Sequence, residues 1–163
     1  MSPLLRGRAA WTVLVVATVL AAALTTSFAL GLHRQHEAER QRQDILAAAR
    51  QSALNFTTLD YRHYGRDSDN VLDGATGDFK RQFAAQTAQL TKLVAENKSV
   101  SKGQVLDAGL VRSAADSARV LVVADSKVAN KSAPKGQART YRLQLDLVRR
   151  DGRWLTSDVD FVG

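Results

Sequence analysis

Apolar and polar side chains alternate in the segment TYRLQLDLV, residues Thr140–Val148. Tyr141, Leu143, Leu145 and Leu147 fall on one side of this alternation, and polar residues stand between them. Because successive side chains of a strand point to opposite faces of a sheet, a period of two is typical of a half-buried strand. The segment therefore predicts a sheet with one apolar face and one solvated face.

Three further segments have the composition and pattern of strands: Gln104–Val111, Arg119–Val128 and Arg153–Val162. The sequence RDG at residues 150–152 predicts a short hairpin turn before the last of them, because Asp and Gly tolerate the backbone of tight turns. Residues 131–136, which include a proline, predict a mobile loop between the second and third strands. Consecutive strands with short connections favour an antiparallel sheet, so we expect four antiparallel strands.

The residues before these strands have a helical period instead. Apolar side chains recur at steps of three and four along one predicted helix face, which consists of Ile45, Ala49, Ala53, Phe56 and Leu59. A second long helix is predicted from about Asp78 to Glu96. The polar stretch 60–69 predicts a break between them, with Asp67 or Asp69 capping a short helix. Helices followed by strands predict an α+β domain, with the helices packed on one face of a curved four-stranded antiparallel sheet.

Residues 9–32 contain no charged side chain and are mostly apolar. A helix of that length rises about 36 Å, against a hydrocarbon core of about 30 Å in a bilayer. We expect a retained transmembrane anchor preceded by a cytoplasmic tail at residues 1–8, because Arg6 and Arg8 favour a cytoplasmic N-terminus. A cleaved signal peptide ending near residues 21–23 is the alternative. The apolar run continues past that point to Leu32, which favours the anchor.

The residues after the anchor predict a stalk and one domain. Residues 33–44 are dense in Arg, Glu and Gln, with opposite charges at helical neighbour spacings. We expect residues 33–52 to form a stalk and the start of the first helix, and residues 53–163 to form an extracytoplasmic α+β domain. In a chain of 163 residues, this part is large enough for one modest core.

Composition narrows the classes of partner. The formal net charge is +7, but basic residues are spread along the chain with acidic residues among them. A surface near anionic lipid headgroups is a simpler explanation than nucleic acid, which an outward-facing domain rarely meets. The chain has no cysteine, which excludes disulfides and thiolate metal sites. We expect no cofactor, no metal site and no nucleic-acid partner.

Few residues suggest chemistry. Asp67, Asp69 and Asp73 form the densest acidic cluster, but the following residues do not fit a calcium loop. His63 lies near Asp60, Tyr61 and Tyr64 and could transfer protons if they lined a cavity, although such clusters more often pack a helix end onto a sheet.

Two further sets of side chains are candidates for binding. A basic hairpin tip could contact lipid headgroups or an acidic partner, although an ordinary solvated turn is the simpler interpretation. It consists of Arg149, Arg150 and Arg153. An apolar pocket between sheet and helices could be lined by Phe79, Phe83, Leu143 and Trp154.

The order of several motifs resembles that of the Mce-associated membrane proteins of actinobacteria. After the short basic tail and single anchor come ALNFTTLDYR at 53–62, LDGATGDF at 72–79, Val105, Ala108-Gly109, Ala118–Asp125, GRWLTSD at 152–158 and Phe161-Val162. The resemblance implies a cone-shaped, cystatin-like domain of the kind seen in type IV secretion assembly factors. It also implies a single-pass plasma-membrane protein that assists Mce transporters, which move lipids through the cell envelope.

The family has no catalytic motif, so we expect no enzymatic activity and no catalytic residues. The leading hypothesis is an accessory protein or scaffold that contacts the membrane and Mce transporter subunits in a lipid-import complex. One alternative is a carrier that binds lipid in the apolar pocket and passes it to the transporter. A less favoured alternative is an enzyme on the same cone fold.

Overall fold

The computed structural model describes residues 36–162 of the chain. Residues from 42 onward pack as one compact unit, and the residues before 42 belong to another. The predicted tail at residues 1–8 and the predicted anchor at residues 9–32 lie outside the described part. Within that part, no helix combines the length and the apolar character needed to cross a membrane.

The first helix is described from residue 36 to residue 57. Its buried face contains Ile45, Ala49, Ala53 and Thr57, which stand four residues apart and confirm the predicted apolar face. The two alanines let this helix approach the sheet closely. Thr57 donates a hydrogen bond from Oγ1 to the Ala53 carbonyl at 2.7 Å, so its polar group is satisfied where it is buried.

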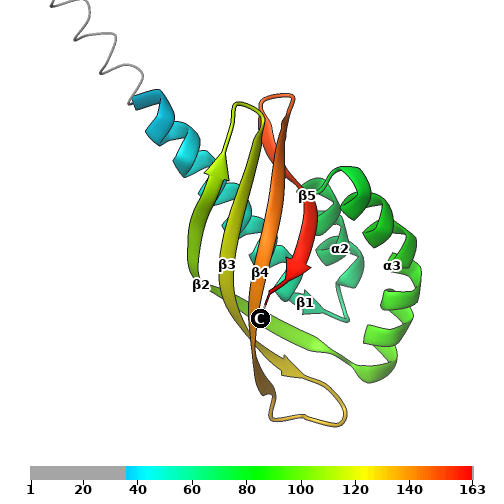
Figure 1. The fold of residues 1–163 in the computed structure, drawn as a ribbon. Coiled ribbons are helices and arrows are strands. Elements are labelled where there is room, and N and C mark those ends of the chain that lie inside the picture. Colours follow the sequence, from blue (N-terminus) through cyan, green and yellow to red (C-terminus); the bar gives the residue numbers. More distant parts are fainter. Residues whose placement is uncertain (1–35, 163) are drawn as a thin grey trace, which may run out of the picture. The chain divides into compact units, whose positions relative to one another are not determined.

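The sheet has five strands in the order β1-β2-β3-β4-β5, each antiparallel to its neighbour (Figure 1). The strands are β1 (Leu59–Asp60), β2 (Val100–Ser113), β3 (Ser117–Ala129), β4 (Gln137–Arg150) and β5 (Arg153–Phe161). The prediction of an antiparallel α+β domain is confirmed, whereas the prediction of four strands is wrong. The additional strand has only two residues, and one of them, Leu59, was expected to continue the first helix.

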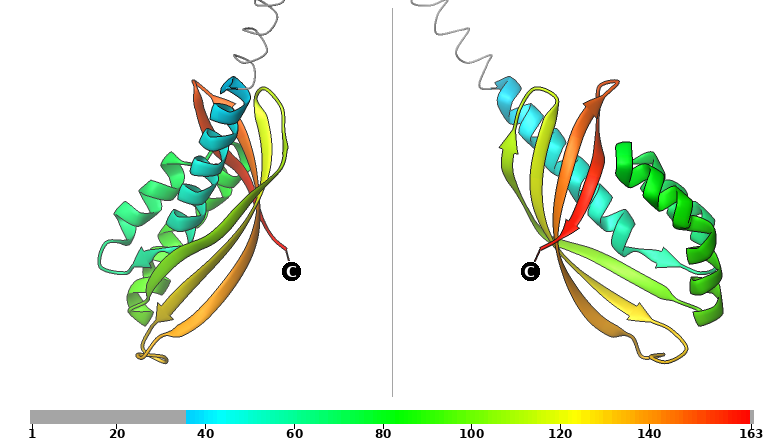
Figure 2. Two further views of the ribbon diagram at one scale, coloured as in Figure 1. Left: turned by 90° about the vertical axis from the view of Figure 1, so that its left-hand side faces the viewer. Right: turned by 45° about the vertical axis from the view of Figure 1, so that its right-hand side comes forward.

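The helices cover one face of the curled sheet and leave the other face bare (Figure 2). The core forms where the first helix packs against the inner face of β3 and β4, and Leu143, Leu145 and Leu147 are each about 1% exposed there. The alternation of apolar and polar side chains in β4 therefore predicted its buried face correctly. The remaining core residues are Leu46, Ala108, Ala118, Val120, Val122 and Trp154.

Two more helices follow β1, namely α2 (Tyr64–Asp73) and α3 (Gly77–Asn97). The limits of α3 lie within one residue of the prediction. The predicted cap of α2 is wrong, because the N-cap residue is His63, which makes no capping hydrogen bond through its side chain. Asp67 and Asp69 lie inside α2, and Asp67 accepts a hydrogen bond from the Asp60 backbone N–H instead.

The turns and bulges set the register of the sheet. Asp151 and Gly152 connect β4 to β5 with φ values of 49° and 78°, which is the left-handed backbone that a two-residue hairpin requires. The loop between β3 and β4 occupies residues 130–136, one residue more than the predicted range 131–136. In β2, register shifts at Leu106 and Val111 mark bulges, which are points where a strand bends and twists more strongly.

Candidate functional site

An apolar recess lies between the first helix, α2 and α3, and we call it the helix recess. Its volume is about 180 Å³. Its walls are mainly apolar side chains: Phe56, Leu59, Tyr64, Val71, Phe83, Leu90 and Val94, together with the polar residues Asn55, Thr58, Asp67 and Ser68. Burial and the charge of Asp67 both raise the pKa of Tyr64, so its phenol stays protonated.

A second recess, which we call the sheet recess, lies where the end of the first helix meets the sheet. Its volume is about 290 Å³, and it shares Phe56, Leu59 and Val94 with the helix recess. The rest of its lining comes from the first helix, the start of β2 and the ends of β3 and β4 that face each other: Thr57, Ser99, Ser101, Val128, Arg139 and Tyr141. The two recesses are therefore neighbours separated by one apolar wall.

A continuous row of aromatic rings follows this wall. Phe83 contacts Phe79 at 6.0 Å between ring centroids, and Phe79 contacts Phe56 at 6.4 Å. Phe161 then contacts Phe56 at 6.1 Å and Tyr141 at 6.3 Å. These distances suit the tilted pairs that aromatic rings prefer. Phe161 is 64% exposed although it lies between Phe56 and Tyr141 in this row, so part of the aromatic surface is open to solvent.

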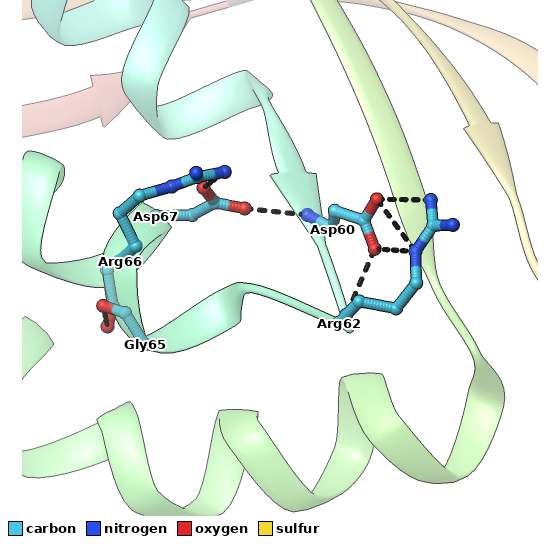
Figure 3. A network of polar contacts seen from close by, with 6 residues as sticks. Asp60, Arg62, Gly65, Arg66 and Asp67 are labelled. Carbon is cyan, nitrogen blue, oxygen red and sulfur yellow. Dashed lines mark hydrogen bonds and ion pairs between the residues drawn. The ribbon is translucent and has the colours of Figure 1, made fainter.

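The segment between β1 and α2 is held by charged groups (Figure 3). Arg62 donates hydrogen bonds to both carboxylate oxygens of Asp60, and its backbone N–H bonds to the same side chain. These bonds lower the pKa of Asp60 to about 2. Arg66 lies 3.6 Å from Asp67, whose other oxygen accepts the Asp60 backbone N–H at 2.8 Å. The network fixes the short strand β1 against α2.

The structure does not bring the four predicted pocket residues together. Phe79 and Phe83 contact each other, and Phe83 lines the helix recess. Leu143 is buried in the core at about 1% exposure. Trp154 belongs to the core and to a different, shallow depression beside the first helix. Leu143 and Trp154 are therefore both members of the hydrophobic core.

The predicted basic tip forms as a hairpin, with Arg149 opposite Trp154 and Arg150 opposite Arg153. All three arginines are exposed. Arg153 donates a hydrogen bond to the Asp73 carbonyl at 3.2 Å, which connects the tip to the end of α2. The side chain of Arg153 is therefore tied to α2, and the backbone N–H of Arg149 donates to the Asp116 carbonyl between β2 and β3 at 2.9 Å.

The residues considered for proton transfer have different surroundings and do not form one polar cluster around a cavity. Asp60 is engaged by Arg62, His63 is exposed, and Tyr64 is buried beside the helix recess. Within residues 36–162, no three acidic or histidine side chains come together as metal ligands.

Arg139 was not among the predicted binding residues, and Phe56 was expected on the apolar face of the first helix. The alternation of the strand places Arg139 on the same face as Tyr141. This feature of the sequence could have indicated that Arg139 lies beside Tyr141 at a binding site.

The bare side of the sheet also has candidate binding features. Leu121 projects from its outer face and is 43% exposed, and the bulge residues Leu106 and Val111 are 52% and 55% exposed. β1 pairs with β2 only at Val100 and Ser101, so β2 beyond that point has no strand partner on that side within the described chain. An open edge and exposed apolar side chains thus occur in the same part of the β2–β3 pair.

Solved structures with this architecture include extracytoplasmic domains. A periplasmic fragment of TraM superimposes with a TM-score of 0.58 and 12% identity, covering 74% of this chain and 96% of that one. An IcmL-like type IV secretion system protein from Legionella pneumophila gives 0.56 and 12%, covering 74% and 91%. At these identities the likeness establishes the fold class only, an α+β domain with a curled antiparallel sheet.

The chain belongs to the family described as "Uncharacterized protein Rv1363c/MT1408-like", whose model matches residues 8–163. A relative from Mycobacterium tuberculosis strain H37Rv, "Uncharacterized protein Rv1363c", is 32% identical over 130 residues. The match covers 80% of this chain, which spans about half the length of that relative. Neither description mentions Mce proteins.

Proposed function

We propose that this protein is a membrane-anchored accessory protein whose extracytoplasmic domain acts as a scaffold in an Mce-type lipid-import complex. The observation that carries the proposal is the asymmetry of the sheet. Helices cover one face, while the other face and the β2 edge expose Leu106, Val111 and Leu121. Exposed apolar side chains beside an unpaired edge favour binding of another protein. The motif order described above supports an Mce subunit as that protein.

The expected anchor would bring this surface close to partners in the membrane. A single apolar helix at residues 9–32 would hold the domain near the bilayer, where its local concentration toward membrane partners rises without any new contact. The periplasmic and secretion-system domains that share the fold support an envelope location. We propose a single-pass plasma-membrane protein with its C-terminal domain outside the cytoplasm.

A lipid carrier is the second candidate, and the size of the recesses counts against it. Sites that enclose drug-sized ligands have volumes of roughly 300–1,000 Å³. The helix and sheet recesses have about 180 and 290 Å³, and neither is closed. A whole lipid does not fit in either. We likewise propose no enzymatic role, because Asp60 is committed to Arg62 and His63 is exposed.

Site-specific photocrosslinking in cells tests the scaffold. A photoreactive amino acid at Leu121 or Val111 in the intact protein should form crosslinks to Mce transporter subunits. Leu93 on α3 is a matched control, because its exposure of 52% lies between those of Leu121 and Val111 and it stands on the helical side. Equal crosslinking from Leu93, or a pull-down of the intact protein that recovers no Mce subunit, would overturn the proposal.

A further inference from the structure

Arg139 is a charged side chain without a partner in the sheet recess, whose lining is partly apolar and partly polar. It lines the sheet recess, and it makes no salt bridge or side-chain hydrogen bond with any residue in the described part of the chain. The arginines Arg62, Arg81 and Arg119, by contrast, are paired with nearby aspartates. Arg139 is therefore free to bind an anion from outside.

The surroundings of Arg139 are apolar on one side and polar on the other. Phe56, Val94 and Tyr141 supply the apolar wall, and the exposed ring of Phe161 extends it by contacting Phe56 and Tyr141. Ser126 stands opposite Arg139 in the register of β3 and β4, and it lines a neighbouring depression rather than the sheet recess itself. Its buried hydroxyl is the one buried side-chain polar atom in residues 36–162 without a hydrogen bond.

We propose that the sheet recess binds an amphiphilic anion, with its carboxylate or phosphate on Arg139 and the first part of its hydrocarbon chain against the Phe56–Tyr141 wall. A guanidinium binds carboxylate and phosphate oxygens through several donors at once. The volume of about 290 Å³ accommodates a headgroup and a short chain, not a whole lipid. Further carbons would extend past Phe56, Leu59 and Val94, the wall shared with the helix recess. This site goes beyond the scaffold function and does not depend on it.

Calorimetry on the full chain in phosphatidylcholine nanodiscs tests the site, with empty nanodiscs as the baseline. The probes are octanoate and octyltrimethylammonium, which have the same chain length and opposite charge. We expect octanoate to bind at least tenfold more tightly than the cation, and Arg139→Gln to weaken octanoate binding by about tenfold or more, since hydrogen bonds to charged groups are the strong ones. Arg142→Gln is the matched control, because Arg142 lies three residues along β4 and faces the opposite side of the sheet.

A second variant tests the apolar half. Val128→Phe fills the recess and should abolish octanoate binding, with circular dichroism and Tm measured to verify the fold. If that variant unfolds, the comparison of Arg139→Gln with Arg142→Gln still tests whether the recess binds the anion. Equal binding of the two probes, unchanged affinity in Arg139→Gln, or no heat beyond that of empty nanodiscs would overturn the site and leave the crosslinking test of the scaffold unaffected.

The same experiment distinguishes two sources of the anion. In nanodiscs that contain phosphatidylglycerol, reduced octanoate binding would identify a membrane-lipid headgroup as the competing ligand. Unchanged binding would identify a free amphiphile as the ligand.

Discussion

Gly103 lies where β2 passes the end of the first helix, and it leaves almost no space for a side chain. A Cβ atom added there would lie 2.1 Å from Thr57 Oγ1 and 2.9 Å from Thr57 Cβ. Thr57 is buried and bonded to the Ala53 carbonyl, so it has little freedom to move. The close approach of helix and strand at this point therefore depends on the absence of a side chain.

We expect Gly103→Ala to lower the free energy of unfolding by about 1–3 kcal/mol, the usual cost of overpacking. Gly109→Ala is the matched control in the same strand, because a Cβ atom there meets nothing within 4 Å. Chemical denaturation of both variants measures the difference. Equal stabilities would contradict the packing described for Gly103.

Asp60 and Arg62 predict a local dependence on pH. The pKa of Asp60 is lowered from 3.8 to about 2 by its bonds from Arg62, so the interaction is complete above pH 4 and is lost as the pH falls toward 2. Arg62 is exposed and Asp60 is only partly buried, so the effect of the pair on stability should be small. A carboxyl ¹³C titration should give a midpoint near 2 for Asp60, and Arg62→Gln should return it toward 3.8. Arg66→Gln should leave that midpoint unchanged, because the guanidinium of Arg66 lies beside Asp67 and not beside Asp60.

At the scale of elements, the β4–β5 hairpin depends on two residues with positive φ. An alanine in the left-handed region costs about 1–2 kcal/mol, so we expect Gly152→Ala to destabilise the domain by roughly that amount. Asp151→Asn should be nearly neutral, because Asn adopts the same conformation readily. Thermal unfolding would check both, and a neutral Gly152→Ala would show that the turn can form in another way.

The elements that could be predicted are those whose signal is local. Alternation identified the buried face of β4, the four-residue spacing identified the face of the first helix, and Asp-Gly identified the turn. The two-residue strand β1 could not be predicted, because it exists only through pairing with Val100 and Ser101 some forty residues later. The cap of α2 was missed because Asp67 bonds to the Asp60 backbone rather than to the helix end.

The candidate site could be predicted even less well from the sequence, because it depends on contacts between residues that are distant in the chain. Phe56 and Tyr141 are far apart in sequence and become neighbours only through the fold. The free guanidinium of Arg139 is recognisable only after the positions of all nearby carboxylates are known. The sequence pattern could not reveal that Phe161 stays exposed while its ring contacts Phe56 and Tyr141.

At the scale of the whole molecule, the expected anchor is the feature to test first. The full chain should sediment with membranes and resist extraction by high salt, and a variant that lacks residues 1–32 should become extractable. Protease added to cells with an opened wall should cleave the C-terminal domain if it lies outside the cytoplasm. Recovery of the full chain in the soluble fraction, or complete protection of the domain, would contradict the proposed topology.

The two edges of the sheet differ in how far they are covered by the rest of the chain. On the β5 side, Thr156 is bridged to Ala75, and its N–H donates to the Gly74 carbonyl, so the α2–α3 connection obstructs that border. On the other side β2 is open but is interrupted by two bulges. A protein with one accessible border can add a single strand and then has no second place for growth. Copies concentrated along a bilayer would therefore join in pairs or take one partner each, and they would not extend into filaments.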